Sequence, residues 1–184
     1  MGLDISYYKL GEKVEVDENI ETWSEEFYEE YGHDVIWLYS NYEMEQSDDL
    51  DGFYRAERLG NFRAGSYSGY SNYRNTLRRL SIVAMAENKE LAEKYKDIVP
   101  FDLQLNFSDC EGFIGPFSSI TLRDQYIDFH GPIIQDIIKM AKYGVKPEIY
   151  KTISREELEY FADLYMDWKK AFEETSNVGV VYYA

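Results

Sequence analysis

The residues best suited to chemistry in this sequence are arginines gathered in one short window. Six of the eight arginines lie between Arg55 and Arg79, where the only acid is Glu57 and no lysine occurs. The window therefore carries a charge of +5 in a chain whose net charge is −16. Because guanidinium groups form paired hydrogen bonds with phosphate and carboxylate oxygens, the window predicts an anion-binding site. The alternative interpretation is that these arginines pair with carboxylates of the acid-rich remainder.

A loop rich in glycine, serine and tyrosine precedes the last three of these arginines. The loop is predicted to run from Phe62 to Tyr70, and a helix is predicted to begin after it, with Ser71 or Asn72 as the N-cap. The first turn of a helix presents unpaired backbone N–H groups and a partial positive charge. A loop that leads into such a helix is therefore expected to hold an anion.

The expected ligand is a small phosphorylated, nucleotide-like molecule that is bound without turnover. Arginines would contact the phosphate, serines and loop amides would donate hydrogen bonds, and a tyrosine ring would stack on the base. The predicted phosphate contacts are Arg63, Arg74 and Arg78. The other predicted contacts are Ser66 and Ser68 for hydrogen bonds, Tyr67, Tyr70 or Tyr73 for stacking, and Asp109 and Glu111 for orienting the arginines or binding ribose hydroxyls.

Two other functions stay open at this point. Asp109 and Glu111 follow a predicted strand, so they also suit the acid–base or metal-ligand roles of a nucleotide-processing hydrolase or transferase. The acid-rich remainder of the chain suits an interaction protein that occupies a basic partner or mimics a nucleic acid. The sequence contains no zinc-ligand motif, phosphate-binding lysine loop or nucleophile elbow, so neither a metal ion nor a cofactor is expected.

Length, charge and cysteine content restrict the class of protein. The 184 residues fit a single domain. A strongly acidic chain is repelled by nucleic acids and by anionic membranes, and no apolar run approaches the roughly 20 residues of a membrane span. The single cysteine, Cys110, fits a reducing compartment, and the first residues lack a signal-peptide pattern. We expect a cytoplasmic protein with no membrane partner and no direct nucleic-acid partner; a homo-oligomer stays open.

The pattern of apolar residues predicts an α+β fold, in which a small sheet packs with about five helices. Strands are expected at residues 3–10, 34–42, 52–59, 101–107 and 178–183. Helical stretches are expected within residues 22–31, 72–84, 89–96, 118–129, 132–143 and 154–172. The alternation over residues 101–107 is the clearest strand signal, and the Gly131-Pro132 pair is expected to separate two helices.

Three stretches of this sequence carry a resemblance to a protein family. They are MGLDI at residues 1–5, FRAGSYSGY at 62–70 and FSDCEGFIGP at 107–116. With the closing pattern of residues 161–183, they make most of the chain resemble an uncharacterised family of bacterial and phage proteins. The occurrence of that family in phages implies an anti-defence role, in which the protein sequesters a nucleotide immune signal, such as a cyclic ADP-ribose isomer or a cyclic oligonucleotide, in the host cytoplasm. The chain departs from the family pattern at Asn72-Tyr73-Arg74, where the aromatic–arginine pair is shifted, and this bears on where the helix begins.

Overall fold

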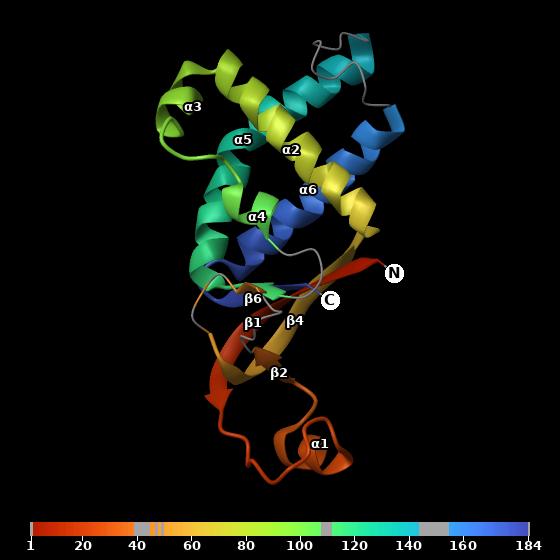
Figure 1. The fold of residues 1–184 in the computed structure, drawn as a ribbon, viewed down its shortest axis with the longest axis vertical. Coiled ribbons are helices and arrows are strands. Elements are labelled where there is room, and N and C mark those ends of the chain that lie inside the picture. The colour runs from red at the N-terminus through yellow and green to blue at the C-terminus, as the bar shows by residue number, and fades with distance from the viewer. Residues whose placement is uncertain are drawn as a thin grey trace.

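The computed structural model describes residues 2–38, 45–46, 48, 50–107, 112–143 and 155–183 (Figure 1). Its elements are β1 (Leu3–Val14), α1 (Glu25–Tyr31), β2 (Val35–Leu38), β3 (Glu45–Gln46), β4 (Gly52–Gly65), α2 (Tyr67–Glu87), α3 (Lys89–Lys94), α4 (Asp102–Asn106), β5 (Gly112–Ile114), α5 (Pro116–Tyr143), α6 (Arg155–Thr175) and β6 (Gly179–Tyr183). The chain therefore has the predicted α+β class.

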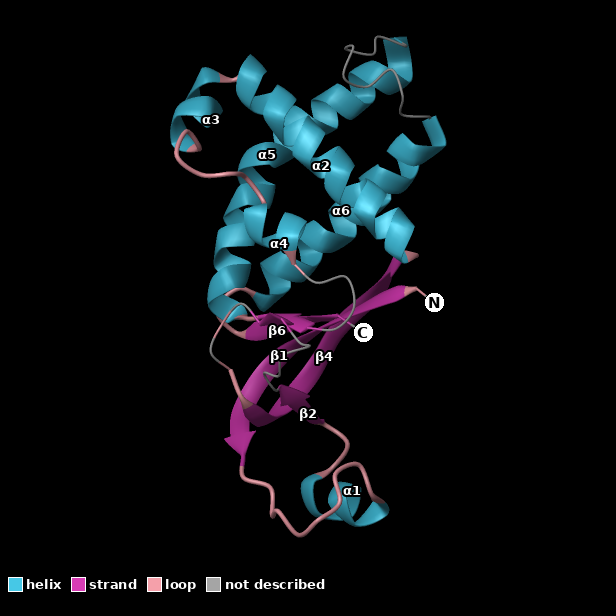
Figure 2. Cartoon of the chain, viewed as in Figure 1, coloured by secondary structure: helices cyan, strands magenta, loops and turns pink. Residues whose placement is uncertain are grey.

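The strands form one sheet in the order β2-β4-β1-β6-β5-β3. All neighbouring pairs are antiparallel except β3 and β5, which are parallel. Figure 2 shows the helices α2 to α6 gathered on one side of this sheet, with α1 at the far end of the long strands β1 and β4. The last strand, β6, lies between β1 and β5, so both ends of the chain contribute to the middle of the sheet.

The two predicted strands at the ends of the chain are confirmed, and their alternation explains how the sheet faces the helices. Along β1, Leu3, Ile5 and Tyr7 are buried in the main core, whereas Asp4 and Lys9 are exposed. Successive side chains of a strand point to opposite faces, so one face of β1 packs against the helices. On β6 the residues Val181 and Tyr183 join the same core.

The core between sheet and helices is made largely of aromatic rings. The fully buried large side chains include Trp168, Tyr70, Tyr73, Tyr126, Tyr165 and Tyr183. The apolar residues of α6, spaced by threes and fours, belong to this core, and so do Tyr73, Leu77, Leu80 and Ala84 on one face of α2. Rings of this size remove large apolar areas from water, and so they hold the helical layer on the sheet.

Hydrogen bonds between the buried phenols explain how the core accommodates so many tyrosines. The hydroxyl oxygens of Tyr73 and Tyr126 lie 2.7 Å apart. Tyr126 donates in turn to Oε1 of Gln104 at 2.8 Å, and Tyr165 donates to the carbonyl of Tyr126 at 3.1 Å. A buried hydroxyl without such a partner would destabilise the fold, so this chain links α2, α4, α5 and α6 by polar contacts as well as by packing.

The strand predicted at residues 101–107 is wrong, because most of this segment is the short helix α4. Phe101 has a φ of 61° and accepts a hydrogen bond at its carbonyl from the amide of Leu105 at 2.8 Å. Gln104, which alternation would place in solvent, is fully buried against Tyr126, whereas Leu103 is only half-buried. Phe101 and Leu105 are four residues apart and therefore also share a helix face. The alternation of apolar residues over this short segment thus fits a helix as well as a strand.

The helix break predicted at Gly131-Pro132 is also wrong, because α5 runs from Pro116 to Tyr143 with Pro132 inside it. A proline within a helix removes one backbone hydrogen bond. Here the helix is held on both sides of the proline by Phe129 and Ile133, which are fully buried. Tertiary packing thus outweighs the local penalty. The proline that starts the helix is instead Pro116.

The N-terminal end of α5 is capped by a residue distant in sequence. The carboxylate of Asp48 accepts hydrogen bonds from the amide of Phe117 at 2.8 Å and from the hydroxyl of Ser118 at 2.6 Å. A carboxylate at this position satisfies amides that have no partner within the helix and opposes the positive end of its dipole. The contact explains how a helix that begins with Gly115-Pro116 is stable without a local capping side chain.

We expect the buried tyrosines to make the protein sensitive to alkali. Burial raises the pKa of Tyr73, Tyr126 and Tyr183 well above the usual value of 10.0. Above about pH 10 the unfolded chain loses protons that the folded chain keeps, so the free energy of unfolding should fall with rising pH, by about 1.4 kcal/mol per pH unit for each such tyrosine. Below that pH these tyrosines should not make the free energy of unfolding depend on pH. Urea unfolding between about pH 9 and about pH 11 measures the effect.

Two phenylalanine variants control this measurement. Tyr126→Phe removes one buried group and should reduce the slope by about 1.4 kcal/mol per pH unit. Tyr67→Phe removes a phenol that is 39% exposed and serves as the matched control. Equal slopes in the two variants would contradict the prediction.

Candidate functional site

The predicted glycine-serine loop is a direct turn from strand to helix. The strand β4 continues through Gly65, where it pairs with Leu3 of β1, and α2 begins at Tyr67. Ser66 is the N-cap, and its hydroxyl accepts a hydrogen bond from the amide of Gly69 at 3.1 Å. The predicted helix start at Ser71 or Asn72 is therefore wrong. Sheet pairing carries the strand further than local sequence indicates, and Gly65 turns the chain with a φ of 93°.

The predicted serine and tyrosine contacts lie partly on the exposed first turn of α2 and partly on its buried face. Ser66, Tyr67 and Ser68 are exposed around the first turn. Tyr70 and Tyr73 point into the aromatic core, and their rings are 6.3 Å apart between centroids. The ring faces of Tyr70 and Tyr73 are therefore packed against protein and are not open for stacking on a ligand.

The arginines of the +5 window do not converge on one site. Along β4, Arg55 forms an ion pair with Asp34 at 2.6 Å, and Arg58 donates to the hydroxyl of Ser6 at 2.9 Å. Arg63 lies on the same strand with its guanidinium against Gly2. Eight residues of extended strand separate Arg55 from Arg63, a distance of about 26 Å.

The three arginines of α2 also diverge. Arg74 donates to the carbonyl of Phe107 at 2.7 Å and lies 4.7 Å from the centroid of the Tyr70 ring. Arg78 faces a groove beside α3, whereas Arg79 faces a pocket beside α6. The predicted residues Asp109 and Glu111 lie outside the described residues, as does Cys110.

Side chains of α2 and α6 enclose a pocket of about 250 Å³. The residues that line it are Gly69, Asn72, Tyr73, Asn75, Thr76 and Arg79 from α2, and Glu157, Tyr160 and Phe161 from α6. On α2, the positions 69, 72, 76 and 79 follow steps of three, four and three and so share one face of the helix. The pocket begins at Gly69, next to the exposed residues Ser66 and Ser68. Here the polar face of α2 lies against α6.

Contacts behind the lining fix the two walls of this pocket. The hydroxyl of Tyr160 donates to the carbonyl of Ala64 at 2.9 Å, which ties α6 to the end of β4. Burial of this hydroxyl raises the pKa of Tyr160, so it stays a neutral donor. Next to it, Phe161 stacks on Tyr73 with ring centroids 5.1 Å apart. The pocket therefore has a rigid aromatic floor and a polar rim.

The rim combines groups that recognise polar ligands. The amides of Asn72 and Asn75 each offer donors and an acceptor, and Thr76 adds a hydroxyl. Arg79 supplies a permanent positive charge, and Glu157 supplies a carboxylate. Across the described part of the chain, no three His, Cys, Asp or Glu side chains are grouped so as to hold a metal ion. The arrangement suits binding through hydrogen bonds and one charged contact.

The sequence interpretation missed most of this pocket. Once Ser66 is taken as the N-cap, the spacing of Asn72, Thr76 and Arg79 on the face of Gly69 can be read from the sequence. Glu157 and Tyr160 carry no comparable signal, because they belong to α6, more than 70 residues further along the chain.

Comparisons of the chain with known protein families, with curated proteins and with solved structures found no match. Among the described helices, none combines the length and apolar character needed to cross a membrane.

Substituting the two glycines at the start of α2 should have opposite effects. Gly65 has a positive φ, and a methyl group there would collide with the hydroxyl of Tyr160, so Gly65→Ala should destabilise the protein by about 1–3 kcal/mol. Gly69 lies within the helix, and a methyl group there would lie 3.3 Å from the Ser66 hydroxyl. Gly69→Ala should therefore be neutral or stabilising by up to about 1 kcal/mol. Urea unfolding of both variants measures the difference, and equal stability would contradict the assigned turn.

Proposed function

We propose that this protein binds a small phosphorylated, nucleotide-like ligand in the pocket between α2 and α6 and does not turn it over. The observation that carries the proposal is that one guanidinium and three neutral hydrogen-bonding side chains line a single pocket over a rigid aromatic floor. That combination suits a ligand with an anionic end and a polar, planar or hydroxylated body.

Arg79 is the phosphate contact in this proposal. A charge-assisted hydrogen bond contributes about 1.5–3 kcal/mol, which makes Arg79 the largest single contribution in the pocket. Asn72 and Asn75 would bind the edge of a base or the hydroxyls of a ribose. Glu157 lies in the same pocket and would orient Arg79 or accept from a ribose hydroxyl.

The size of the pocket limits the ligand. Small-molecule sites typically enclose about 300–1,000 Å³, and this pocket encloses about 250 Å³. A mononucleotide, or the nucleotide part of a larger molecule, is therefore favoured over a whole cyclic oligonucleotide. In the biological form of the proposal, the protein sequesters a nucleotide immune signal in the cytoplasm of a phage-infected cell.

Binding without turnover is favoured over catalysis because of the acids in the pocket. In the part of the lining that the structure describes there is one carboxylate, Glu157, whereas hydrolysis by acid–base pairs or paired metal ions calls for at least two groups. The enzyme alternative depends on Asp109 and Glu111, which lie outside the described residues.

Titration calorimetry against AMP, GMP, cyclic ADP-ribose and a cyclic dinucleotide tests the proposal. Arg79→Ala should weaken binding of the recognised ligand by about 10- to 100-fold, because it removes one charge-assisted contact. Arg78→Ala is the matched control: it removes the same charge from the neighbouring residue, which faces away from the pocket, and should preserve affinity.

Three results would count against this function. They are no heat with any of these ligands, equal losses in Arg78→Ala and Arg79→Ala, and conversion of the bound ligand on a chromatogram. Conversion that is lost in Asp109→Asn would assign the protein to the nucleotide-processing enzymes.

A further inference from the structure

A second, chemically different groove lies on the other side of α2. It encloses about 510 Å³ between α2, α3 and the segment that follows α3. The residues that line it are Arg78, Ser81, Ile82, Met85 and Ala86 from α2, and Ala92, Tyr95, Lys96, Ile98, Val99 and Pro100 from the opposite wall. Most of these side chains are apolar, so the groove differs from the polar pocket beside α6.

Large aliphatic side chains stand open to solvent in this groove. Ile82 is 49% exposed, and Ile98 and Val99 are each 54% exposed. Single exposed aliphatic residues are common, but several that share one groove mark a surface for a partner. Burying each of them would remove apolar area from water.

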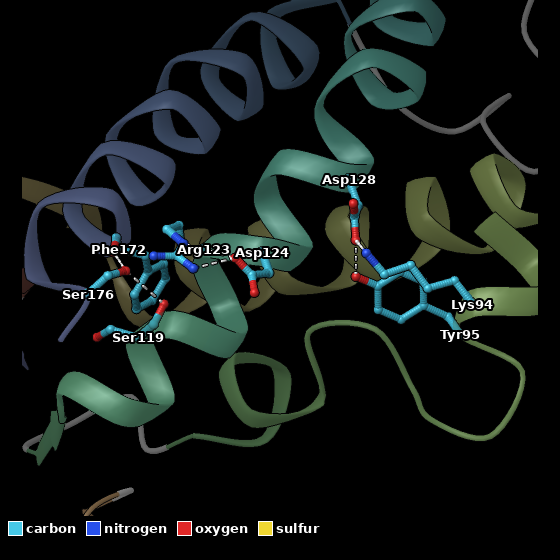
Figure 3. A network of polar contacts seen from close by, with 8 residues as sticks. All are labelled: Lys94, Tyr95, Ser119, Arg123, Asp124, Asp128, Phe172 and Ser176. Carbon is cyan, nitrogen blue, oxygen red and sulfur yellow. Dashed lines mark hydrogen bonds and ion pairs between the residues drawn. The ribbon is translucent and has the colours of Figure 1, made fainter. Parts of the chain in front are cut away.

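The far wall of the groove is held in place by the fold. Asp128 of α5 accepts hydrogen bonds from Tyr95 and Lys94, both at 2.5 Å (Figure 3). Backbone hydrogen bonds from Ile98 to Tyr95 at 3.3 Å and from Asp102 to Val99 at 3.2 Å order the segment after α3. The exposed side chains are therefore presented by an ordered backbone.

The charge of the groove is opposite to that of the molecule. Among the described residues, its lining contains the two cations Arg78 and Lys96 and no carboxylate, although the chain as a whole carries −16. Lys96 is paired with Glu93 at 2.6 Å, but both side chains are exposed. Exposed pairs of this kind contribute little to stability, so a carboxylate of a partner can replace Glu93.

We propose that this groove docks an acidic amphipathic helix of another protein. The part of α2 that lines the groove, from Arg78 to Ala86, is about 12 Å long, or roughly two helical turns. Apolar residues of a partner helix at spacings of three and four would contact Ile82, Ile98 and Val99, as in other helix-in-groove complexes. Acidic residues beside them would meet Arg78 and Lys96.

Charge also argues against a second copy of this chain as the occupant. A two-fold contact through the groove would bring Arg78 and Lys96 of both copies together. Two molecules of net charge −16 also repel one another over longer range. An acidic helix from a different protein is free of the first penalty.

Fluorescence anisotropy with a labelled peptide tests the proposal. The probe is a helix of about 15 residues with leucines along one face and glutamates elsewhere; the comparison peptide carries lysines in place of the glutamates. The acidic peptide should bind more tightly, although the net charge of the protein favours the basic one. Ile98→Asp should weaken its binding at least tenfold. Ile127→Asp, at an isoleucine of α5 that is 52% exposed and outside the groove, should not.

Each remaining outcome overturns the proposal. Tighter binding of the lysine peptide, or equal losses in Ile98→Asp and Ile127→Asp, would show that the groove is not the docking site. Sedimentation of the protein alone that reveals a dimer lost in Ile98→Asp would assign the groove to a second copy. These outcomes do not depend on the pocket beside α6, since Arg79→Ala should leave peptide binding unchanged.

Discussion

Burial of Tyr70 and Tyr73 sets the rotation of α2 about its axis, and the surfaces of the protein depend on that rotation. Both rings pack among Trp168, Phe161 and Tyr183 in the layer between helices and sheet. Fully burying a large apolar side chain stabilises a fold by about 1.5–3 kcal/mol. A rotation that exposed both rings would cost a large part of the roughly 5–15 kcal/mol that stabilises a typical domain. The polar residues of α2 therefore face whichever directions this rotation leaves to them.

Two faces of α2 follow from this setting. Asn72, Thr76 and Arg79 turn toward α6 and complete a polar pocket, whereas Arg78 and Ile82 turn toward α3 and line an apolar groove. The same aromatic layer places α6, so the core positions both walls of the pocket. The two proposed binding sites therefore lie on different faces of one helix.

The parts of the fold that could be predicted from the sequence are those whose periodicity records burial against a large layer. The alternation of β1 and the stripe of α6 are of this kind. The segment 101–107 could not be assigned because a run this short satisfies both periods, and its choice depends on the contact between Gln104 and Tyr126. The continuity of α5 through Pro132 likewise depends on packing that no local signal reports.

The sequence places its candidate site around the start of α2, and the structure shows a polar pocket on a different face of that helix from Tyr70 and Arg74. Of the three serines after Gly65, the one that caps α2 is selected by the pairing of Gly65 with Leu3, which is distant in sequence. The start at Ser66 brings Gly69 into the helix, on the same face as Asn72, Thr76 and Arg79. Arg74, which the sequence favoured, lies on another face and contacts the carbonyl of Phe107. The walls contributed by α6 could be found only once the two helices were seen side by side.

Chemical modification of tyrosines, followed by mass spectrometry, tests the rotation of α2 most directly. With N-acetylimidazole on the folded protein, Tyr67 should be modified rapidly because it is exposed, whereas Tyr70 and Tyr73 should react only when the protein unfolds. Modification of Tyr70 or Tyr73 at the rate of Tyr67 would contradict this rotation of α2, and the residues of the polar pocket and the apolar groove would then face other directions.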